Sequence, residues 1–373
     1  MRIFYYALEY PTPMYLWQRQ HHIGELEAAG HEIIRFNPAD WPDMDTANTE
    51  AAKALREAGH VDLFMTCDDQ DTVYPGTLLE ASRLGIPTLL ICWDNLELPH
   101  KQKRLARVAD LVWLLSWETQ YLFEKWGAKD IIFMPYAANP LTYKPVDAPD
   151  VIPTVGFIGS PYASRANVLN GLLDAGVECT VCSNALFDSG FNSSTPDRKT
   201  HFDPIDLAVK ASRYMRFPIG RKVFLAAVLN KFHRGSRLTA PRQGLTAMRS
   251  VDHAEMCRLY SSFALSLNIP ELRDTYILKH PIPKLHLRTF EIPMCGGLQL
   301  MSRVPEVEQY FVDGEEIVLY SSQEELIDKA RHYLDPRHAA EVHRMREAAR
   351  ARALSDHTWT HRFTRIFNRL GIG

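Results

Sequence analysis

The sequence predicts an α/β protein of two domains, each a parallel sheet with helices wound on both of its faces. Short β-rich runs alternate with helical segments along both halves of the chain, which is the pattern of strand–helix–strand crossover units. The 373 residues, of which 46% are hydrophobic and 23% charged, are enough to bury two cores. Prolines and acidic residues near Asn139-Pro140 and between Lys144 and Pro153 interrupt the alternation, so we place an exposed linker there.

The first domain is expected at residues 1–150, with six strands and five helices. The strands are expected at Arg2–Ala7, Glu32–Phe36, Val61–Thr66, Pro87–Cys92, Leu111–Leu115 and Ile131–Met134. The helices are expected at Leu16–Ala29, Thr46–Ala58, Gly76–Leu84, Lys101–Ala109 and Thr119–Trp126. Glycine follows several of these segments, as it does at the ends of many helices.

The second domain is expected at residues 151–355, where the alternation starts again with a strand at Thr154–Ile158. Further strands are expected at Val177–Cys182, Phe263–Leu267, Leu298–Met301 and Ile317–Tyr320, and helices at Arg165–Ala175, Glu324–Leu334 and Ala339–Leu354. The tail, residues 356–373, contains one more helix, Thr358–Leu370, which we expect to pack back toward the first domain.

A basic insertion, at about residues 195–250, interrupts the second domain. Between Leu207 and Arg249 it contains ten Lys or Arg and no Asp or Glu, although the chain has a formal net charge of -3. Its middle, 220–235, is typical of a helix with an apolar body and basic ends. This asymmetry indicates an anionic partner. Docking on anionic lipid headgroups and a helical cap over a cleft both stay open, whereas no nucleic acid is expected because no recognition motif is present.

Cysteine and histidine patterns argue against a disulfide framework and against a standard metal site. Cys179 and Cys182 fall in an alternating, strand-like run, where a redox CxxC pair would need the start of a helix. The fifteen histidines include no HExxH spacing. We see no stretch of about 18 apolar residues and no signal peptide, so we expect a cytoplasmic protein.

Two segments of the second domain have the residues of a ligand site. Gly159 and Ser160 follow its first strand and lead to Arg165 at a helix start, where free backbone N–H groups can hold a diphosphate. A plain strand–helix turn with a solvent-exposed arginine is the alternative. In the run Arg288–Gly297, the Glu291 carboxylate can accept both hydroxyls of a ribose. Here the alternative is an exposed Arg288–Glu291 pair on a helix.

Several motifs of the second domain resemble the CgeB-type glycosyltransferases, which are relatives of glycosyltransferase family 4 (group 1). The resemblance rests on Arg288–Gly297, on the preceding Tyr260–Asn268, on the following Pro305–Phe311 and on the tail Asp356–Arg362. It is specific over about Glu255–Phe367 and looser over Thr154–Arg165. It implies the GT-B fold, with two Rossmann-like doubly wound domains facing a cleft.

The resemblance also implies where a nucleotide sugar binds. Glu291 would hold the ribose, and the diphosphate would lie near Gly159, Ser160, Arg165 and Arg288. Further donor-binding candidates are Thr289, Gly296 and Gly297. No metal and no cofactor are implied, because basic residues and helix dipoles stabilise the leaving diphosphate. One departure concerns Pro283, which stands where family members often have a second glutamate.

The first domain is expected to supply the acceptor side from loops that follow its strands. We favour Asp94, which follows the fourth strand, as a contact to the acceptor hydroxyl or as a general base, because CgeB-like sequences commonly place an acidic residue there. A helix N-cap is the alternative for Asp94. Further acceptor-side candidates are Glu9, Tyr10, Asp69 and Asn95. A metal at the Asp68–Asp71 carboxylates is disfavoured, since Asp is also an ordinary loop residue.

The predicted function is sugar transfer from a UDP-, GDP- or dTDP-linked donor to a hydroxyl of a glycan, a lipid-linked or a protein acceptor. From the resemblance we expect a metal-independent, retaining enzyme of cell-envelope or other surface glycan synthesis, and binding of the insertion to lipid would place it on the inner face of the cytoplasmic membrane. Two alternatives stay open. One is a non-catalytic scaffold that binds a nucleotide sugar, or an envelope- or spore-maturation protein, because fold alone does not prove turnover. The other is a nucleotide-sugar 2-epimerase.

Overall fold

The chain divides into two compact units in the computed structural model. The structure describes residues 1–10, 12–146, 151–162, 164–187, 212, 215–232, 237–272 and 275–373. Unit 1 consists of 1–139 together with 358–373, and unit 2 of 140–357. The boundary after Asn139 lies at the start of the expected linker, and the segment after Pro140 packs within unit 2. There the Tyr143 hydroxyl bonds Glu291 and the Val146 amide bonds Ser261 Oγ at 3.1 Å.

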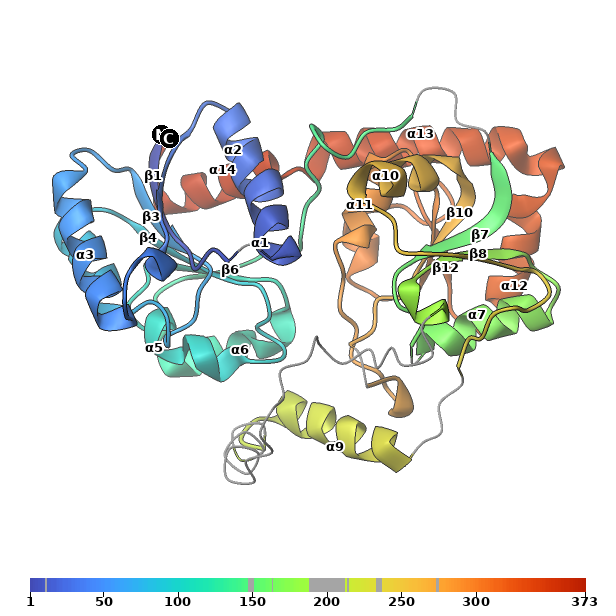
Figure 1. Ribbon diagram of the computed structural model, residues 1–373, viewed down its shortest axis with the longest axis horizontal. Coiled ribbons are helices and arrows are strands. Elements are labelled where there is room, and N and C mark those ends of the chain that lie inside the picture. Colours follow the sequence, from blue (N-terminus) through green and yellow to red (C-terminus); the bar gives the residue numbers. More distant parts are fainter. Residues whose placement is uncertain are drawn as a thin grey trace. The chain divides into compact units, whose positions relative to one another are not determined.

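Unit 1 contains a six-stranded parallel sheet in the order β2-β1-β3-β4-β5-β6 (Figure 1). The strands are β1 Arg2–Tyr6, β2 Glu32–Phe36, β3 Leu63–Thr66, β4 Thr88–Cys92, β5 Leu111–Leu114 and β6 Ile131–Phe133. The helices are α1 Pro13–Gln18, α2 Gly24–Ala28, α3 Met44–Glu57, α4 Pro75–Arg83, α5 Lys103–Ala106, α6 Gln120–Trp126 and α14 Trp359–Leu370. A π-helical turn, Arg19–Ile23, joins α1 to α2 within the single helix that the sequence predicts.

Side chains alternate between the two faces of this sheet, as the period of a strand requires. Ile3 and Tyr5 face a core that includes Ile23, Leu26 and four apolar residues of α14, namely Trp359, Phe363, Ile366 and Phe367. On the other face Phe4 stacks on Phe36 and Phe64, with ring centroids 6.0 and 5.7 Å apart. The last helix of the chain is thus part of the core of the first unit.

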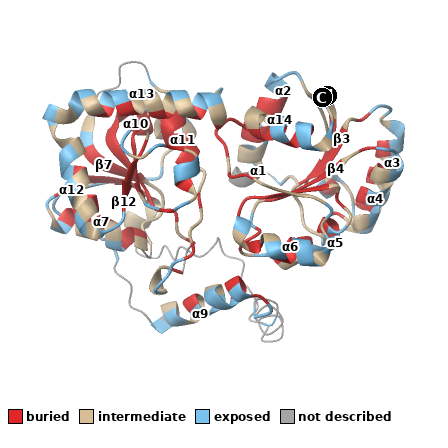
Figure 2. Cartoon of the chain, turned by 180° about the vertical axis from the view of Figure 1, so that it is seen from behind, coloured by how far each residue is buried: buried red, intermediate tan, exposed pale blue. Residues whose placement is uncertain are grey.

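Unit 2 contains a second six-stranded parallel sheet, in the order β12-β11-β10-β7-β8-β9. The strands are β7 Ile152–Ile158, β8 Cys179–Cys182, β9 Leu245–Met248, β10 Phe263–Asn268, β11 Gln299–Ser302 and β12 Val318–Tyr320. The described helices are α7 Ser164–Asp174, α9 Pro218–Phe232, α10 His253–Ser262, α11 Arg288–Met294, α12 Gln323–Leu334 and α13 Ala339–Asp356. Figure 2 shows most of β7 and all of β12 buried, and the helices exposed along their outer sides. Cys179 and Cys182 are buried in β8, with their pKa values raised by burial, in keeping with a structural role.

Two elements of unit 2 differ from the sequence prediction. The strand β9 lies within the stretch 195–250 that the sequence assigns to the basic insertion, and it pairs with β8 from Cys179–Leu245 to Cys182–Met248. The insertion therefore ends before Leu245. The second element is the helix α10, which is not among the helices predicted from the sequence. It begins at a cap, since the Asp252 side chain accepts a hydrogen bond from the Glu255 amide at 2.9 Å. The predicted insertion residues 195–211, 213–214 and 233–236 lie outside the described residues.

Each sheet changes its winding direction once, and a parallel sheet offers its ligand crevice at that switch point, beyond the carboxyl ends of the strands. The switch lies between β1 and β3 in unit 1 and between β7 and β10 in unit 2. Among the described residues, we find no helix long and apolar enough to span a membrane.

Candidate functional site

Arg288 and Gly159 meet at the carboxyl end of β7. The Arg288 Nε donates to the carbonyl of Ile158 at 3.0 Å, and its guanidinium lies over the Phe157 ring, 5.6 Å from the centroid. Gly159 has φ +142°, which favours glycine, and a Cβ there would overlap the Arg288 guanidinium. Glycine at 159 is thus what allows the arginine to approach the strand end.

Arg165 brings a second guanidinium to the same strand end. It is buried near the start of α7, 4.7 Å from the Tyr162 ring centroid and 5.9 Å from that of Phe157. Its Nη1 donates to the Ser160 carbonyl at 3.4 Å. The structure therefore brings together the predicted residues Gly159, Ser160, Arg165 and Arg288, and it excludes the interpretation of Arg165 as a solvent-exposed arginine.

His286 and Lys284 complete what we call the cationic corner, defined by Arg165, Lys284, His286 and Arg288. Burial, with the nearby charges of Arg288, Arg165 and Lys284, lowers the pKa of His286 to about 3. The imidazole is therefore neutral near pH 7, and the corner carries three positive charges. Such a group of charges is complementary to an anionic ligand.

Glu271 is a carboxyl at the edge of the cationic corner that sequence reasoning did not identify. It follows β10, and its backbone forms an isolated antiparallel bridge with Pro283. Burial raises the pKa of Glu271, while Ser164 and Arg165 lower it, and its Oε2 has no hydrogen-bond partner among the described residues. The only sequence signal was its position directly after a buried strand.

Glu291 lies one turn along α11 from Arg288 and is buried rather than exposed. Its Oε1 accepts a hydrogen bond from the Tyr143 hydroxyl at 2.5 Å. Burial raises the pKa of Glu291, while Tyr143, Arg288 and His253 lower it. The alternative of an exposed Arg288–Glu291 helix pair is therefore wrong. Since Tyr143 occupies Oε1, a ribose would bond Oε2 or displace the tyrosine.

Three further predicted donor residues have structural contacts. Thr289 is fully buried, and its Oγ1 accepts a hydrogen bond from Asn268 Nδ2 at 3.1 Å. Gly296 and Gly297 lie beyond the opposite end of α11 from Arg288. The Gly296 carbonyl accepts from Arg346 Nε at 2.7 Å, and a Cβ at Gly297 would meet the Tyr260 carbonyl at 2.6 Å. The structure thus does not join the two glycines to the cationic corner.

A cavity of about 270 Å³ opens at the carboxyl ends of β1, β3 and β4 in unit 1. Its lining includes Asp68, Asp69 and Asp94, and we call it the acidic pocket. Asp94 is exposed in a turn after β4, and its backbone carbonyl accepts from the amides of Glu97 and Leu98. The next helix is a 3₁₀ turn that begins at Pro99, and its N-cap residue is Leu98.

Asp68 is the acidic-pocket residue with the most perturbed carboxyl, and sequence reasoning did not single it out. Burial raises the pKa of Asp68 to about 7, with additional repulsion from Asp69 and Glu9, although the Leu8 amide donates to its Oδ2 at 2.7 Å. A carboxyl that titrates near neutral pH has the proton affinity of a general base or acid.

The other acceptor-side candidates differ in how free their side chains are. Asp69 pairs with Lys101 Nζ at 2.7 Å, and that ammonium also lies 3.6 Å from Asp71. Asn95 is fully buried: its Nδ2 donates to Ser116 and Thr119, and its Oδ1 accepts from the amides of Leu115 and Ser116. All its bonding capacity is used within the fold, so Asn95 as an acceptor contact is wrong.

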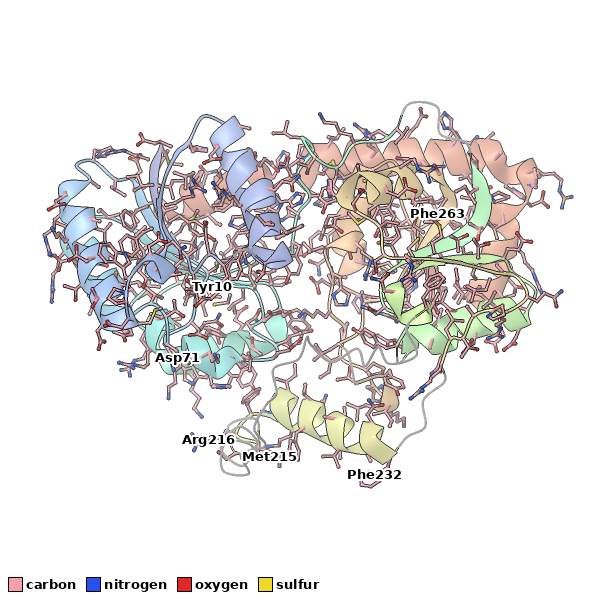
Figure 3. The ribbon with its side chains drawn as sticks, viewed as in Figure 1. Tyr10, Asp71, Met215, Arg216, Phe232 and Phe263 are labelled. Carbon is pink, nitrogen blue, oxygen red and sulfur yellow. The ribbon has the colours of Figure 1, made fainter. Side chains whose placement is uncertain are left out.

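Glu9 and Tyr10 lie after β1. The Glu9 backbone exchanges two hydrogen bonds with the Asn37 side chain, at 2.9 and 3.0 Å. Tyr10 is 49% exposed and lies edge-on to Tyr15, at 6.2 Å between centroids. Figure 3 labels Tyr10 and Asp71 among the side chains of this unit. Neither Glu9 nor Tyr10 is part of the lining of the acidic pocket.

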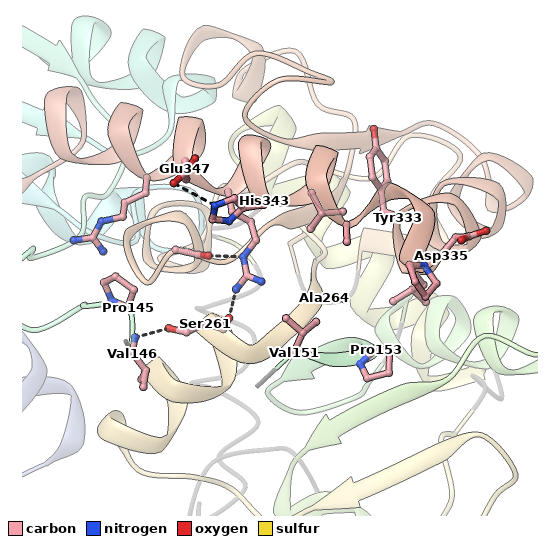
Figure 4. Close-up of a pocket in the computed structure, with 17 residues that line it drawn as sticks. Pro145, Val146, Val151, Pro153, Ser261, Ala264, Tyr333, Asp335, His343 and Glu347 are labelled. Carbon is pink, nitrogen blue, oxygen red and sulfur yellow. Dashed lines mark hydrogen bonds and ion pairs between the residues drawn. The ribbon is translucent and has the colours of Figure 1, made fainter. Parts of the chain in front are cut away.

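A larger cavity, of about 580 Å³, lies near the amino ends of β7 and β10 (Figure 4). Apolar residues such as Val151, Ala264 and Val342 line it, and Arg346 crosses its wall to bond the carbonyls of Gly296 and Ser261. Because ligands of parallel sheets bind at the carboxyl ends of the strands, the cationic corner and not this cavity is the candidate ligand site of unit 2.

Comparisons with known proteins agree with this architecture. Residues 221–368 match the family model described as "Glycosyl transferase-like". An alpha-glucosyltransferase solved with UDP-glucose and DNA containing an abasic site has 14% identity and a TM-score of 0.60, covering 100% of this chain and 99% of its own. Anabaena Alr3699/HepE, solved with UDP, has 13% identity and a TM-score of 0.57, covering 100% of both chains.

Sucrose-phosphate synthase from Thermosynechococcus elongatus is also similar, with 13% identity and a TM-score of 0.54, covering 99% of this chain and 98% of its own. No curated protein sequence matches the chain. At these identities the likeness shows the fold, and the predicted GT-B class, with two parallel sheets flanked by helices, is confirmed.

Proposed function

We propose that this protein is a glycosyltransferase of the hexosyltransferase type, which moves a sugar from a UDP-, GDP- or dTDP-linked donor to a hydroxyl acceptor. The observation that carries the proposal is the pair of guanidinium groups, Arg165 and Arg288, held against Phe157 at the β7/β10 switch point. The match of residues 221–368 to a glycosyl transferase-like family model supports it.

The donor diphosphate would bind in the cationic corner. Two guanidinium groups and Lys284 offer charge-assisted hydrogen bonds that strengthen as the diphosphate leaves and its negative charge grows. That stabilisation is what a divalent cation supplies in other phosphate sites, so the proposed reaction needs no metal. Turnover should therefore survive a chelator.

Recognition of the sugar nucleotide would use two carboxyls. Glu291 would hold the ribose hydroxyls, with Tyr143 fixing the orientation of its carboxylate. The backbone of Glu271 forms a β-bridge with Pro283, the position where related sequences often have a second glutamate. The Oε2 atom of Glu271 lacks a hydrogen-bond partner among the described residues. We assign Glu271 to the hydroxyls of the transferred sugar.

The acceptor would bind at the acidic pocket of unit 1. Asp94 is exposed there and can orient a hydroxyl, while Asp68, with a pKa of about 7, can take its proton. The CgeB-like resemblance favours retention, in which the departing diphosphate helps to deprotonate the acceptor. Proton NMR of the first product decides between retention and inversion of the anomeric configuration. Retention would leave Asp68 and Asp94 as positioning groups.

Nucleotide release tests turnover directly. The wild-type protein is incubated with UDP-, GDP- and dTDP-sugars and a panel of glycan acceptors, with and without a chelator. We expect acceptor-dependent release with at least one donor, and its loss in Glu291→Ala and Glu271→Gln. Binding of a donor without release across the panel would favour a non-catalytic scaffold, and a 2-epimerized donor would favour an epimerase.

The helix α9 supports a proposal on location, at an anionic membrane surface where a lipid-linked or envelope glycan would be made. Its exposed side includes Phe224, Leu225, Leu229 and Phe232, the last 82% exposed, and the basic side chains Arg216, Arg221 and Lys222 lie at its start. Figure 3 labels Arg216 and Phe232 near its two ends. Apolar insertion and lipid charge would act together on such a surface.

A further inference from the structure

Two histidines and a glutamate converge at the corner between α12 and α13. His332 lies in the last turn of α12, His338 ends the 3₁₀ turn Pro336–His338, and Glu341 lies in the first turn of α13. The corner is tight because the Asp335 side chain caps the 3₁₀ turn, accepting from the Arg337 amide at 2.9 Å. The three side chains therefore come from three consecutive elements.

Two of the three distances among the donor atoms match the edges of a small coordination polyhedron. His332 Nε2 and His338 Nδ1 each lie 3.2 Å from the same oxygen, Oε2 of Glu341, and all three atoms lie within 4.8 Å of one another. The two imidazole rings are 3.6 Å apart between centroids. In a tetrahedral zinc site with bonds of about 2.0–2.1 Å, neighbouring ligand atoms lie about 3.3–3.4 Å apart.

We propose that His332, His338 and Glu341 form a binding site for a first-row divalent metal ion, with Zn²⁺ as the best fit. Two imidazoles and one carboxylate are a ligand set that zinc prefers, and water would fill the fourth position on the exposed side. The side chains are 42%, 34% and 35% exposed, so an ion reaches them without unfolding.

The ion would act as a clamp between α12 and α13. The two helices flank the cavity of Figure 4, whose wall includes Tyr333, Leu334, Asp335 and Ala339 from this corner. None of the three ligands belongs to the cationic corner, so the metal site does not depend on the proposed sugar transfer. Because metal would bind the folded corner preferentially, it should raise the melting temperature of unit 2.

Calorimetric titration of ZnCl₂ into the full-length protein, stripped with a chelator and dialysed, tests the site. We expect one equivalent of Zn²⁺ to bind, and at least about a tenfold loss of affinity in His332→Ala and in His338→Ala, since each removes one of three ligands. The matched control is His343→Ala, two residues beyond Glu341 on α13, whose imidazole pairs with Glu347 at 3.4 Å. It should bind zinc like the wild type.

Melting curves without metal establish that the variants fold, because all three histidines are partly exposed. Co²⁺ in place of Zn²⁺ should give the intense visible absorption of a tetrahedral site in the wild type and in His343→Ala. Absence of stoichiometric Zn²⁺ binding would overturn the proposal. So would equal affinity in the wild type, His332→Ala and His338→Ala, because adventitious histidines would then be the ligands.

Discussion

The fold raises the pKa of one carboxyl in the acidic pocket, that of Asp68. Its ordinary pKa of 3.8 is raised to about 7 by burial and by Asp69 and Glu9. The folded state therefore prefers the neutral acid. The stability that Asp68 contributes is fully present below pH 3.8 and is lost as the pH rises through about 7.

Replacement Asp68→Asn keeps a neutral side chain at every pH. We predict that the melting temperature of the variant, relative to wild type, rises by several degrees between about pH 4 and pH 8. Asp62→Asn is the control, because the Arg2 amide lowers the pKa of Asp62. Its melting temperature relative to wild type should fall with rising pH only below about pH 4, and should stay constant between about pH 4 and pH 8. Parallel melting temperatures of Asp68→Asn and wild type over this range would contradict the assigned pKa.

Gly159 is the residue whose backbone conformation the cationic corner needs. In Gly159→Ala the new Cβ meets the Arg288 guanidinium at a φ of +142°. We expect a destabilisation of about 1–3 kcal/mol and at least a tenfold weaker binding of nucleoside diphosphates, measured by chemical denaturation and calorimetry. Gly76→Ala is the control, because nothing lies within 4 Å of its Cβ. Unchanged stability and unchanged nucleoside diphosphate affinity in Gly159→Ala would show that Arg288 is not held against Gly159.

The site residues that could be predicted were those that lie in a recognisable local sequence pattern. Gly159, Ser160 and Arg165 follow a strand and begin a helix, which places them at a sheet edge from sequence alone. Glu271 and Asp68 were not singled out, because their raised pKa values depend on burial by distant parts of the chain. Asn95 looked like a pocket residue, yet its four hydrogen bonds reach residues about twenty positions away.

At the scale of elements, α9 is a helix with two kinds of surface. Ala226 is buried, and Asn230 accepts a hydrogen bond from Tyr276 at 2.6 Å, so one side packs on unit 2. The other side exposes Leu225, Leu229 and Phe232. The capping and the membrane interpretations of the basic segment therefore concern opposite sides of the same helix.

Liposome flotation tests the membrane proposal for α9. We expect the protein to float with vesicles of anionic lipid at low salt, and less at high salt because exposed charges are screened. Replacing Leu225, Leu229 and Phe232 together by Ser should abolish flotation and leave nucleotide binding unchanged. Arg344→Ala on α13 is the control. Flotation that persists in the triple variant would place the membrane contact elsewhere.

Most elements followed from periodicity and glycine positions, and the exceptions have physical reasons. The edge strand β9 is four residues long and only partly buried, and its side chains show no clear alternation. It is therefore recognised as a strand only by its pairing with β8 in the structure. The π-helical turn Arg19–Ile23 buries His21 and His22 against the core, which an ideal helical period does not predict.

At the scale of the molecule, the last helix, α14, belongs to unit 1, together with the first strand, β1. Trp359 is fully buried against Trp17, Trp93 and Trp113. Trp359→Ala should cost about 3–5 kcal/mol, since it leaves a large cavity. Hydrogen exchange should show faster exchange in the strands of unit 1 and unchanged rates in unit 2.

Trp117→Ala, at a side chain that is 58% exposed, is the matched control for Trp359→Ala and should leave both units unchanged. Equal effects of Trp359→Ala on the exchange of the two units would contradict the division of the chain into 1–139 with 358–373 and 140–357.

The central claim, that the cationic corner binds the donor diphosphate, is tested most directly by calorimetric titration with UDP, GDP and dTDP. We predict that wild type binds at least one of them. Arg165→Ala and Arg288→Ala should each weaken that binding by about 10- to 100-fold, because a hydrogen bond to a charged group contributes about 1.5–3 kcal/mol. Arg344→Ala, at an exposed position, should bind like wild type. Wild-type affinity in both corner variants would contradict the account.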